Sequence, residues 1–207
     1  ERCESPCIEF LFENKRDLPA DDSCLFRSEL LKLMFLTRTR PDIKLPVAYL
    51  STKMQNPTKY DQDKLKRIVS YLNGTKTLGL TLKLHGLQLF ASADASYAVH
   101  QDKKGQSGIV LWMGNKNAPI HVESRKQSIV SRSSTESELI SLTTCVEEAI
   151  WGKNLLDEIG FNQNKVIVHQ DNKSTIIIAN RGPGRCGRTK HIDIRYFFVK
   201  EHIDNGD

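Results

Sequence analysis

The second half of this chain carries a long helical pattern between two strand patterns, and this order constrains the fold more than any other feature. Alternating apolar residues predict a strand that starts at residue 80 or 87 and ends at Ala93, and the β-branched run 166–168 predicts another. Between them, apolar residues recur at helical spacing over 134–159. The apolar face of this helix is predicted to comprise Leu139, Leu142, Val146, Ile150, Leu156 and Ile159. Because such a helix crosses over and returns to the same sheet, we expect the two strands to be parallel.

Shorter patterns complete a mixed sheet with flanking helices. Two more strands are predicted at 109–113 and 119–123, joined by a turn. A short helix at 176–179 and a last helix from about Asp193 follow the final strand. Antiparallel strands, a long helix and a parallel strand together predict an α/β domain.

Residues 1–79 are predicted to form a separate helical part. Its third helix is predicted to begin at Asn56-Pro57, with Asn as the N-cap and Pro as the first helical residue. Gly74 is predicted to be the first residue beyond that helix. After residue 79 the apolar spacing changes from helical to alternating, so we place a boundary there, between 1–79 and 80–207.

Composition excludes some classes of protein and leaves others open. With 39% hydrophobic and 27% charged residues, the chain of 207 residues is predicted to be globular, and no apolar run is long enough to span a membrane. The formal net charge of +5 is too small to indicate nucleic-acid binding by itself. Five cysteines without regular spacing fit a reducing, intracellular compartment better than a disulfide framework. Cys3 and Cys7 have no partner pair at the spacing of a zinc finger.

Three acidic residues lie where a sheet can bring carboxylates together. Asp94 follows the first strand, Glu138 lies in the first turns of the long helix, and Asp171 follows the last strand. Carboxylates from distant parts of a chain must converge to hold two divalent cations over a phosphodiester. Each acid alone has an ordinary explanation, because Asp is common in turns and at helix N-caps.

The long helix offers a second acid, Glu136. Ser133-Ser134-Thr135-Glu136 is predicted to be a capping box, in which Glu136 reaches back to the amide of the cap residue. Since this structural role accounts for Glu136, we favour Glu138 as the functional acid and keep Glu136 as the alternative.

Short motifs extend this pattern beyond the acids. Asp94-Ala95-Ser96 is an acid followed by a small and a polar residue, and Glu138-Leu139-Ile140-Ser141-Leu142 surrounds the helix acid. Arg188-Thr189-Lys190-His191-Ile192-Asp193-Ile194-Arg195-Tyr196 follows later, and Leu36-Thr37-Arg38-Thr39-Arg40-Pro41-Asp42-Ile43 lies in the helical part. Together these segments resemble the end of the reverse transcriptase and the ribonuclease H region of copia-type LTR retrotransposon Pol polyproteins. The resemblance implies a ribonuclease H-like fold after a helical reverse-transcriptase tail. It implies no polymerase activity, because the paired-Asp hairpin of the polymerase would lie upstream.

The resemblance implies an endonuclease that hydrolyses the RNA strand of an RNA–DNA hybrid. Asp94, Glu138 and Asp171 would be its catalytic residues and would hold two Mg²⁺ ions, with Mn²⁺ as the alternative metal. Its partners would be the hybrid and the reverse-transcriptase portion of the same polyprotein, inside the cell and away from membranes. The alternative function is that of a degenerate, non-catalytic remnant that binds nucleic acid or only folds. A strand-transfer enzyme of the same fold would need other acid spacing and a zinc-binding N-terminal region.

The resemblance also implies a fourth acidic ligand, which we expect this chain to lack. Copia-type chains place it in a Gln-Leu-Ala-Asp motif after a fifth strand, whereas this sequence ends at Asn205-Gly206-Asp207. Asp193 is the nearest substitute, but an Asp in the first turn of a helix is explained by the helix dipole. We therefore predict a structural role for Asp193 and a domain truncated before its fifth strand. The absence of an initiator Met likewise predicts a piece of a longer chain.

A glycine-rich, basic loop is predicted between the last strand and the last helix. Its cationic side chains are predicted to contact the phosphates of a duplex, which requires charge but no base-specific chemistry. The alternative is a solvated loop. The residues concerned are Arg181, Arg185, Arg188, Lys190 and His191.

Overall fold

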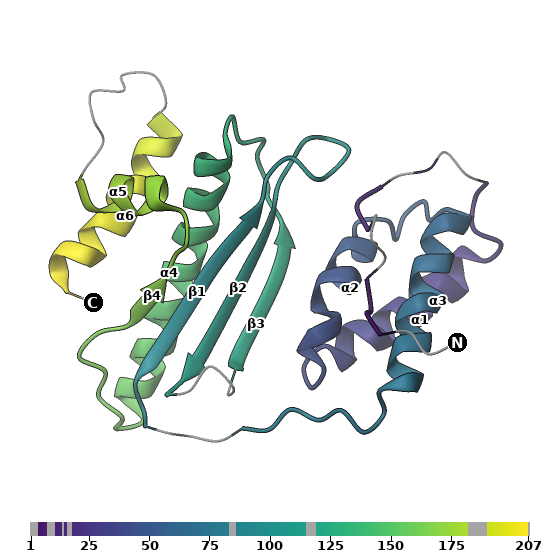
Figure 1. The fold of residues 1–207 in the computed structure, drawn as a ribbon, viewed down its shortest axis with the longest axis horizontal. Helices are drawn as coiled ribbons and strands as arrows, with labels where there is room; N and C mark the ends of the chain where they lie inside the picture. The colour runs from purple at the N-terminus through teal and green to yellow at the C-terminus, as the bar shows by residue number, and fades with distance from the viewer. Residues whose placement is uncertain are drawn as a thin grey trace. The chain divides into compact units, whose positions relative to one another are not determined.

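Helices make up the first part of the chain, and a sheet with helices makes up the second (Figure 1). The computed structural model describes residues 4–7, 11–13, 15, 18–82, 86–114, 119–181 and 190–206, without the side chains of 181 and 190–193. Contacts between Cα atoms group the chain into two units, which are residues 1–80 with 124–126 and residues 81–123 with 127–207. No helix among the described residues combines the length and the apolar character needed to cross a membrane.

The helical unit has one apolar core. Its elements are α1 (Ser23–Leu36), the 3-10 helix η1 (Pro41–Ile43), α2 (Lys44–Ser51) and α3 (Lys59–Gly74). The core is formed by buried side chains from all of them, among which are Phe26, Leu30, Ile43, Leu50, Leu65 and Ile68. Asp42 pairs with Arg40 at 2.7 Å and accepts a hydrogen bond of 2.8 Å from Tyr71, which fastens η1 to α3.

The start and end of α3 differ from the prediction. Thr58 is the N-cap, since its hydroxyl accepts from the amide of Asp61 at 3.3 Å while the Asp61 carboxylate accepts from the amide of Thr58 at 3.0 Å. The prediction of Asn56 as the cap was wrong, because this reciprocal capping box satisfies two free amides at once. Gly74 is the last helical residue, and Thr75 is the C-cap.

The second unit contains a mixed sheet with the strand order β3-β2-β1-β4. The strands are β1 (Leu89–Ser96), β2 (Gln106–Met113), β3 (Pro119–Lys126) and β4 (Ile167–His169). β1 is antiparallel to β2 and parallel to β4, with Phe90 opposite Ile167, which confirms the predicted parallel pairing. The α/β fold with a mixed sheet and flanking helices is therefore confirmed. β1 begins later than predicted and continues beyond Ala93, so Asp94 lies inside the strand.

The long helix α4 (Ser134–Glu158) covers one face of the sheet (Figure 1). Small residues allow this close packing, since a Cβ added at Gly152 would lie only 3.1 Å from a methyl carbon of Leu89. Residues of the shared core include Ala91, Ala93, Ile109, Leu111, Cys145 and Ala149. Ile159 was wrongly assigned to the apolar face and is 59% exposed. It is the C-cap residue of α4, and the chain changes direction at the next residue, Gly160, which has a φ of 91°.

Two shorter helices complete the second unit. α5 (Lys173–Arg181) follows β4, and α6 (Lys190–Asn205) packs against α4 through a small core. That core consists of Leu142, Val146, Ala179 and Val199. α6 begins three residues before the predicted Asp193. In the described part of the chain, β4 lies at one edge of the sheet.

Candidate metal centre

Three carboxylates from separate elements converge in the second unit. One oxygen from each of Asp94 in β1, Glu138 in α4 and Asp171 after β4 lies within 4.8 Å of the other two. Asp94 and Asp171 are exposed, whereas Glu138 is buried. The structure thus brings together the three acids that the sequence singled out.

Asp94 is held by contacts between β1 and α4. The Ser141 hydroxyl donates a hydrogen bond of 2.7 Å to the backbone carbonyl of Asp94. One Asp94 carboxylate oxygen accepts from the amide of Ala95 at 2.8 Å. Ser141 lies three residues after Glu138, so both lie on nearly the same side of α4. The helix therefore fixes Asp94 and supplies Glu138 from one face.

A buried polar network holds the first turns of α4. The Gln127 amide group donates to the Ser107 hydroxyl at 3.1 Å and to the Ser137 carbonyl at 2.9 Å. The Ser137 hydroxyl donates back to the Gln127 side-chain oxygen at 3.1 Å. Gly105 leaves the space for this network, since an added Cβ would lie 2.5 Å from that oxygen. These hydrogen bonds hold Ser137, the residue directly before Glu138, and so fix the backbone that carries the Glu138 side chain.

Glu136 lies outside the carboxylate cluster and helps to begin α4. Its amide donates to the Ser133 hydroxyl at 3.1 Å, and its carboxylate accepts from the amide of Arg132 at 2.7 Å. The predicted capping role is present, but the carboxylate reaches one residue further back than predicted. Among the described residues, Glu138 is the acid of α4 that joins Asp94 and Asp171.

After β4, the side chain of Asp171 belongs to the carboxylate cluster and does not cap the helix that follows. Asn172, not Asp171, accepts the hydrogen bond from the amide of Thr175 at 3.1 Å and so provides the cap of α5. Gln170 accepts from the amide of Asn172 at 2.9 Å and donates to the Glu138 carboxylate at 3.4 Å. Sequence reasoning missed Gln170 and Gln127, because a single Gln beside a strand carries no periodic signal.

The cluster makes Glu138 an unusually weak acid. The pKa of Glu138 is raised to about 7, and burial is the largest cause of this rise. The carboxylates of Asp94 and, more weakly, Asp171 contribute to it, while the hydrogen bond from Gln170 opposes it. A nearby divalent cation would reverse this balance, because it stabilises ionised carboxylates.

The donor set fits hard divalent cations. All three side chains offer oxygen, the donor that Mg²⁺, Ca²⁺ and Mn²⁺ prefer. Crowded carboxylates, one of them buried, are unfavourable together unless a cation compensates their charge. The side chain of Asp193 is not among those described, so its structural role stays a prediction.

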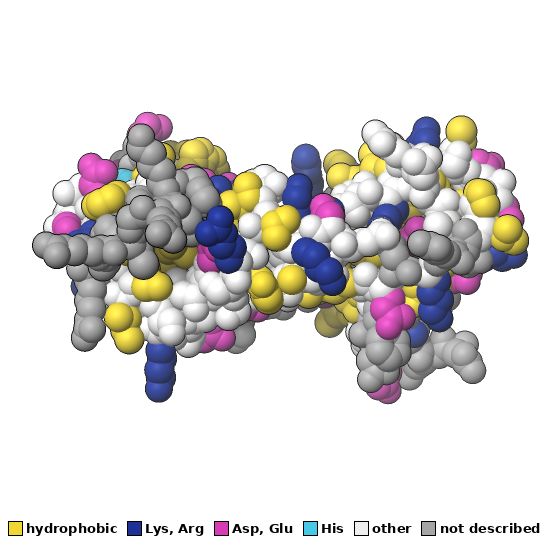
Figure 2. Space-filling view, turned by 90° about the horizontal axis from the view of Figure 1, so that it is seen from above, with side chains coloured by type: hydrophobic (Ala, Val, Ile, Leu, Met, Phe, Trp, Pro, Cys, Tyr) yellow, Lys and Arg dark blue, Asp and Glu magenta, His cyan; other side chains and the backbone are white. Residues whose placement is uncertain are grey.

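The predicted basic loop lies outside the described side chains. Residues 182–189 are not described, and of Arg181, Lys190 and His191 only the backbone is. On the face drawn in Figure 2, Lys and Arg side chains are interspersed with apolar and acidic ones, and the described residues there form no continuous basic surface. Phosphate contact by this loop remains a prediction.

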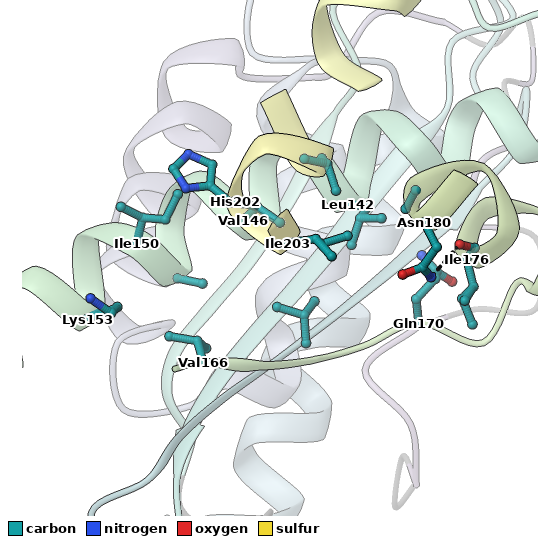
Figure 3. Close-up of a pocket in the computed structure, with 14 residues that line it drawn as sticks. Leu142, Val146, Ile150, Lys153, Val166, Gln170, Ile176, Asn180, His202 and Ile203 are labelled. Carbon is teal, nitrogen blue, oxygen red and sulfur yellow. Dashed lines mark hydrogen bonds between the residues drawn. The ribbon is translucent and has the colours of Figure 1, made fainter. Parts of the chain in front are cut away.

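A cavity of about 280 Å³ lies beside the cluster but does not include its acids (Figure 3). Side chains of α4, β4, α5 and α6 line it, most of them apolar, such as Val146, Val166 and Ile203. Gln170 lines the cavity and also donates to Glu138. Gln170 therefore links the cavity to the cluster.

Known proteins with similar sequences include retrotransposon polyproteins. No protein-family model matches the chain. It is 36% identical over 189 residues to the retrovirus-related Pol polyprotein from transposon RE1 of Arabidopsis thaliana. It is 33% identical over 181 residues to the corresponding polyprotein from transposon TNT 1-94 of Nicotiana tabacum. These matches cover 89% and 87% of this chain but only 13% and 14% of the polyproteins.

A solved structure shares the fold over nearly the whole chain. The foamy viral protease-reverse transcriptase in complex with dsDNA superposes with a TM-score of 0.53, at 13% identity, over 96% of this chain and 39% of that one. The sheet order and the crossover helix give the second unit a ribonuclease H-like fold. The chain is thus similar to the retrovirus-related Pol polyproteins of copia-type transposons and spans about an eighth of the length of these relatives.

Proposed function

We propose that residues 80–207 act as a Mg²⁺-dependent ribonuclease H that cleaves the RNA strand of RNA–DNA hybrids. The observation that carries this proposal is the convergence of Asp94, Glu138 and Asp171 within 4.8 Å on a ribonuclease H-like sheet. In the same proposal, residues 1–79 are the helical tail of the reverse transcriptase of the polyprotein, and the protein acts inside the cell.

The residues of the site have different parts in this proposal. Two Mg²⁺ ions, or Mn²⁺ in their place, would supply an activated water and stabilisation of the leaving 3′ oxygen. Asp94, Glu138 and Asp171 would hold the ions, and Gln170 donates a hydrogen bond to one oxygen of Glu138. The small side chains of Ala95 and Ser96 leave room for a phosphodiester beside Asp94. Selectivity for the hybrid would come from duplex shape and 2′-hydroxyl contacts rather than from base reading.

The test is hydrolysis of a hybrid with labelled RNA by the 207-residue chain. We expect slow cleavage in Mg²⁺ or Mn²⁺, products with 3′-hydroxyl ends, and no cleavage in EDTA. The rate should be low because the described side chains offer three carboxylates where the family resemblance implies four, and two-metal catalysis tolerates little misplacement. Asp94→Asn should abolish cleavage. Asp63→Asn, an exposed aspartate of α3, is the matched control and should leave the rate unchanged.

Two results would change the proposal. Hybrid binding without any metal-dependent cleavage would favour the degenerate, nucleic-acid-binding remnant. A large loss of rate in Asp193→Asn would show that Asp193 supplies the fourth ligand, against its predicted structural role.

A further inference from the structure

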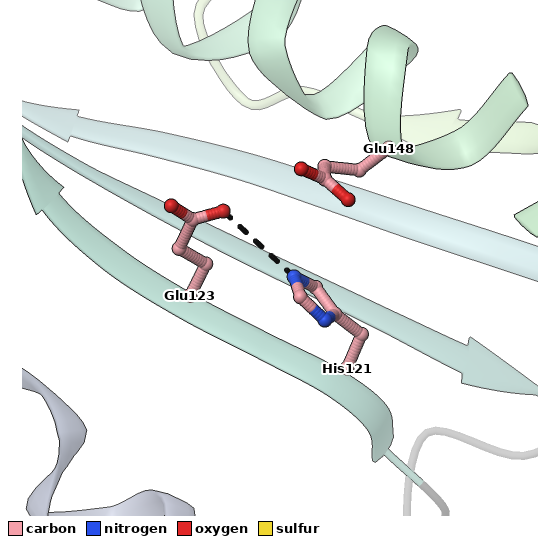
Figure 4. Close-up of side chains that lie close together, drawn as sticks. All are labelled: His121, Glu123 and Glu148. Carbon is pink, nitrogen blue, oxygen red and sulfur yellow. Dashed lines mark ion pairs between the residues drawn. The ribbon is translucent and has the colours of Figure 1, made fainter. Parts of the chain in front are cut away.

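A second group of metal-binding side chains lies between β3 and α4. His121 and Glu123 are two residues apart on β3, so they project from the same face of the strand, and Glu148 comes from α4. One donor atom of each lies within 4.8 Å of the other two. Figure 4 shows the three side chains directed toward one another.

The polarity of β3 is reversed relative to an ordinary covered strand. The helix-facing positions carry His121 and Glu123, whereas Ile120, which projects the other way, is 49% exposed. The Nε2 atom of His121 is covered from solvent, although its side chain as a whole is 38% exposed. The imidazole thus directs its nitrogen inward, toward two carboxylates. His121 and Glu123 lie within ion-pair range of each other, and Glu148 places a second carboxylate beside them.

We propose that His121, Glu123 and Glu148 bind one divalent transition-metal ion, such as Zn²⁺ or Co²⁺, with water at the remaining positions. The His121 Nε2 and Glu123 Oε2 atoms are 3.8 Å apart, which is too long for a hydrogen bond. The same separation fits two atoms that bind one ion between them, each at about 2.1 Å from it. Two carboxylates and a neutral imidazole carry the charge that a divalent cation balances.

The donor set separates this site from the carboxylate cluster. An imidazole nitrogen selects Zn²⁺ or Co²⁺ over Mg²⁺, whereas three carboxylates favour the harder ion. Glu148 lies ten residues after Glu138 on α4, which corresponds to about 15 Å along the helix. The two sites are therefore distinct, and this proposal does not depend on nuclease activity. An ion bound here would tie the edge strand β3 to α4.

The test is a Co²⁺ titration of the 207-residue chain in millimolar Mg²⁺, which competes with Co²⁺ for the carboxylate cluster. We expect one Co²⁺ to bind, with visible absorption bands of a protein-bound ion, and Zn²⁺ to displace it. Saturating Zn²⁺ should also raise the thermal midpoint of the chain. His121→Gln and Glu148→Gln should each weaken binding at least tenfold. Glu147→Gln, the exposed neighbour on α4, and His169→Gln, on β4, are matched controls that should bind as the native chain does.

Far-UV circular dichroism checks the fold of each variant. If His121→Gln does not fold, the Co²⁺ affinity of Glu148→Gln tests the proposal. Equal Co²⁺ affinity in the native chain and in Glu148→Gln would overturn the proposal. Absence of Co²⁺ and Zn²⁺ binding at millimolar metal would do so as well. In either case the inward charges of β3 would serve only to hinder edge-to-edge pairing of this strand.

Discussion

Glu138 occupies the least favourable position of the three acids. Its side chain is buried, two further carboxylates lie within 4.8 Å, and Gln170 donates one hydrogen bond of 3.4 Å to it. A site that binds cations tightly is often unfavourable in their absence, because its ligands repel one another. The metal-free protein should therefore be destabilised by Glu138, the residue that we propose as a metal ligand.

Glu138→Gln should stabilise the metal-free chain at high pH. The pKa of Glu138 is about 7 in the folded state against an ordinary 4.5. Folding stability from this group is complete below pH 4.5 and falls as the pH rises to about 7, because only the unfolded state releases the proton in that range. In EDTA at pH 8, Glu138→Gln should unfold with a free energy higher by on the order of 2 kcal/mol, with little difference at pH 4. Urea denaturation at both pH values measures this.

Glu136→Gln is the matched control for that measurement. Glu136 has a capping hydrogen bond to the amide of Arg132, so its neutralisation should cost stability slightly rather than add to it. Addition of Mg²⁺ should cancel the advantage of Glu138→Gln by stabilising only the native chain. If Glu138→Gln stabilised the chain equally at pH 4 and pH 8, the gain in stability would not come from the ionisation of Glu138.

At the scale of elements, helix starts were the least predictable feature. Two consecutive segments offer cap residues before α3, and the sequence alone does not say which one the chain uses. Thr58 is selected because Asp61 reaches back to its amide, and because Leu18 and Ala20 pair with the residues around the cap. These last contacts come from a segment distant in sequence and leave no local pattern.

Thr58→Ala should destabilise the helical unit, and Asn56→Ala should not. Removing the Thr58 hydroxyl leaves the amide of Asp61 without its capping acceptor, which costs about 1 kcal/mol. The described structure gives Asn56 no capping hydrogen bond to α3. Chemical denaturation followed by far-UV circular dichroism compares the two variants. A larger loss in Asn56→Ala would contradict the capping geometry described above.

The segment between α5 and α6, which the sequence predicts to be a basic loop, should govern the salt dependence of hybrid binding. If its cations contact phosphates, Arg185→Gln with Arg188→Gln should weaken binding and reduce the slope of log affinity against log salt by about 2. Hybrids of different sequence should be affected equally, because phosphate contacts do not read bases. Arg27→Gln with Arg38→Gln, in the helical unit, removes the same charge and should leave the slope unchanged. Fluorescence anisotropy at several salt concentrations provides the measurement, and an unchanged slope in the loop variant would support a solvated loop.

At the scale of the whole molecule, the sequence predicted the order of the elements better than their contacts. The strand–helix–strand pattern around α4 predicted the parallel pairing of β1 with β4, because chain connectivity restricts such crossovers. The acids were predicted from their positions at strand and helix ends and from the resemblance. Gln127, Ser141 and Gln170 were not, because their partners are distant in sequence. Likewise, the reversed polarity of β3 becomes visible only when α4 is in place beside His121.

The two cores should unfold as separate cooperative units, which tests the proposed boundary near residue 80. Both tryptophans, Trp112 and Trp151, lie in the second unit, so tryptophan fluorescence reports its unfolding, whereas far-UV circular dichroism reports helices of both. We expect the two signals to give different urea transitions, with Mg²⁺ shifting only the one seen by fluorescence.

Matched core variants assign these transitions. Leu30 and Leu111 are both buried, one in each unit, and truncation of either to Ala should cost about 2–5 kcal/mol. Leu111→Ala should lower the urea midpoint of the transition followed by fluorescence. Leu30→Ala should leave that midpoint unchanged and lower the midpoint of the helical unit, which only circular dichroism reports. Coincident transitions that respond equally to both variants would mean that the chain folds as one cooperative unit, and the boundary between 1–79 and 80–207 would then have no thermodynamic meaning.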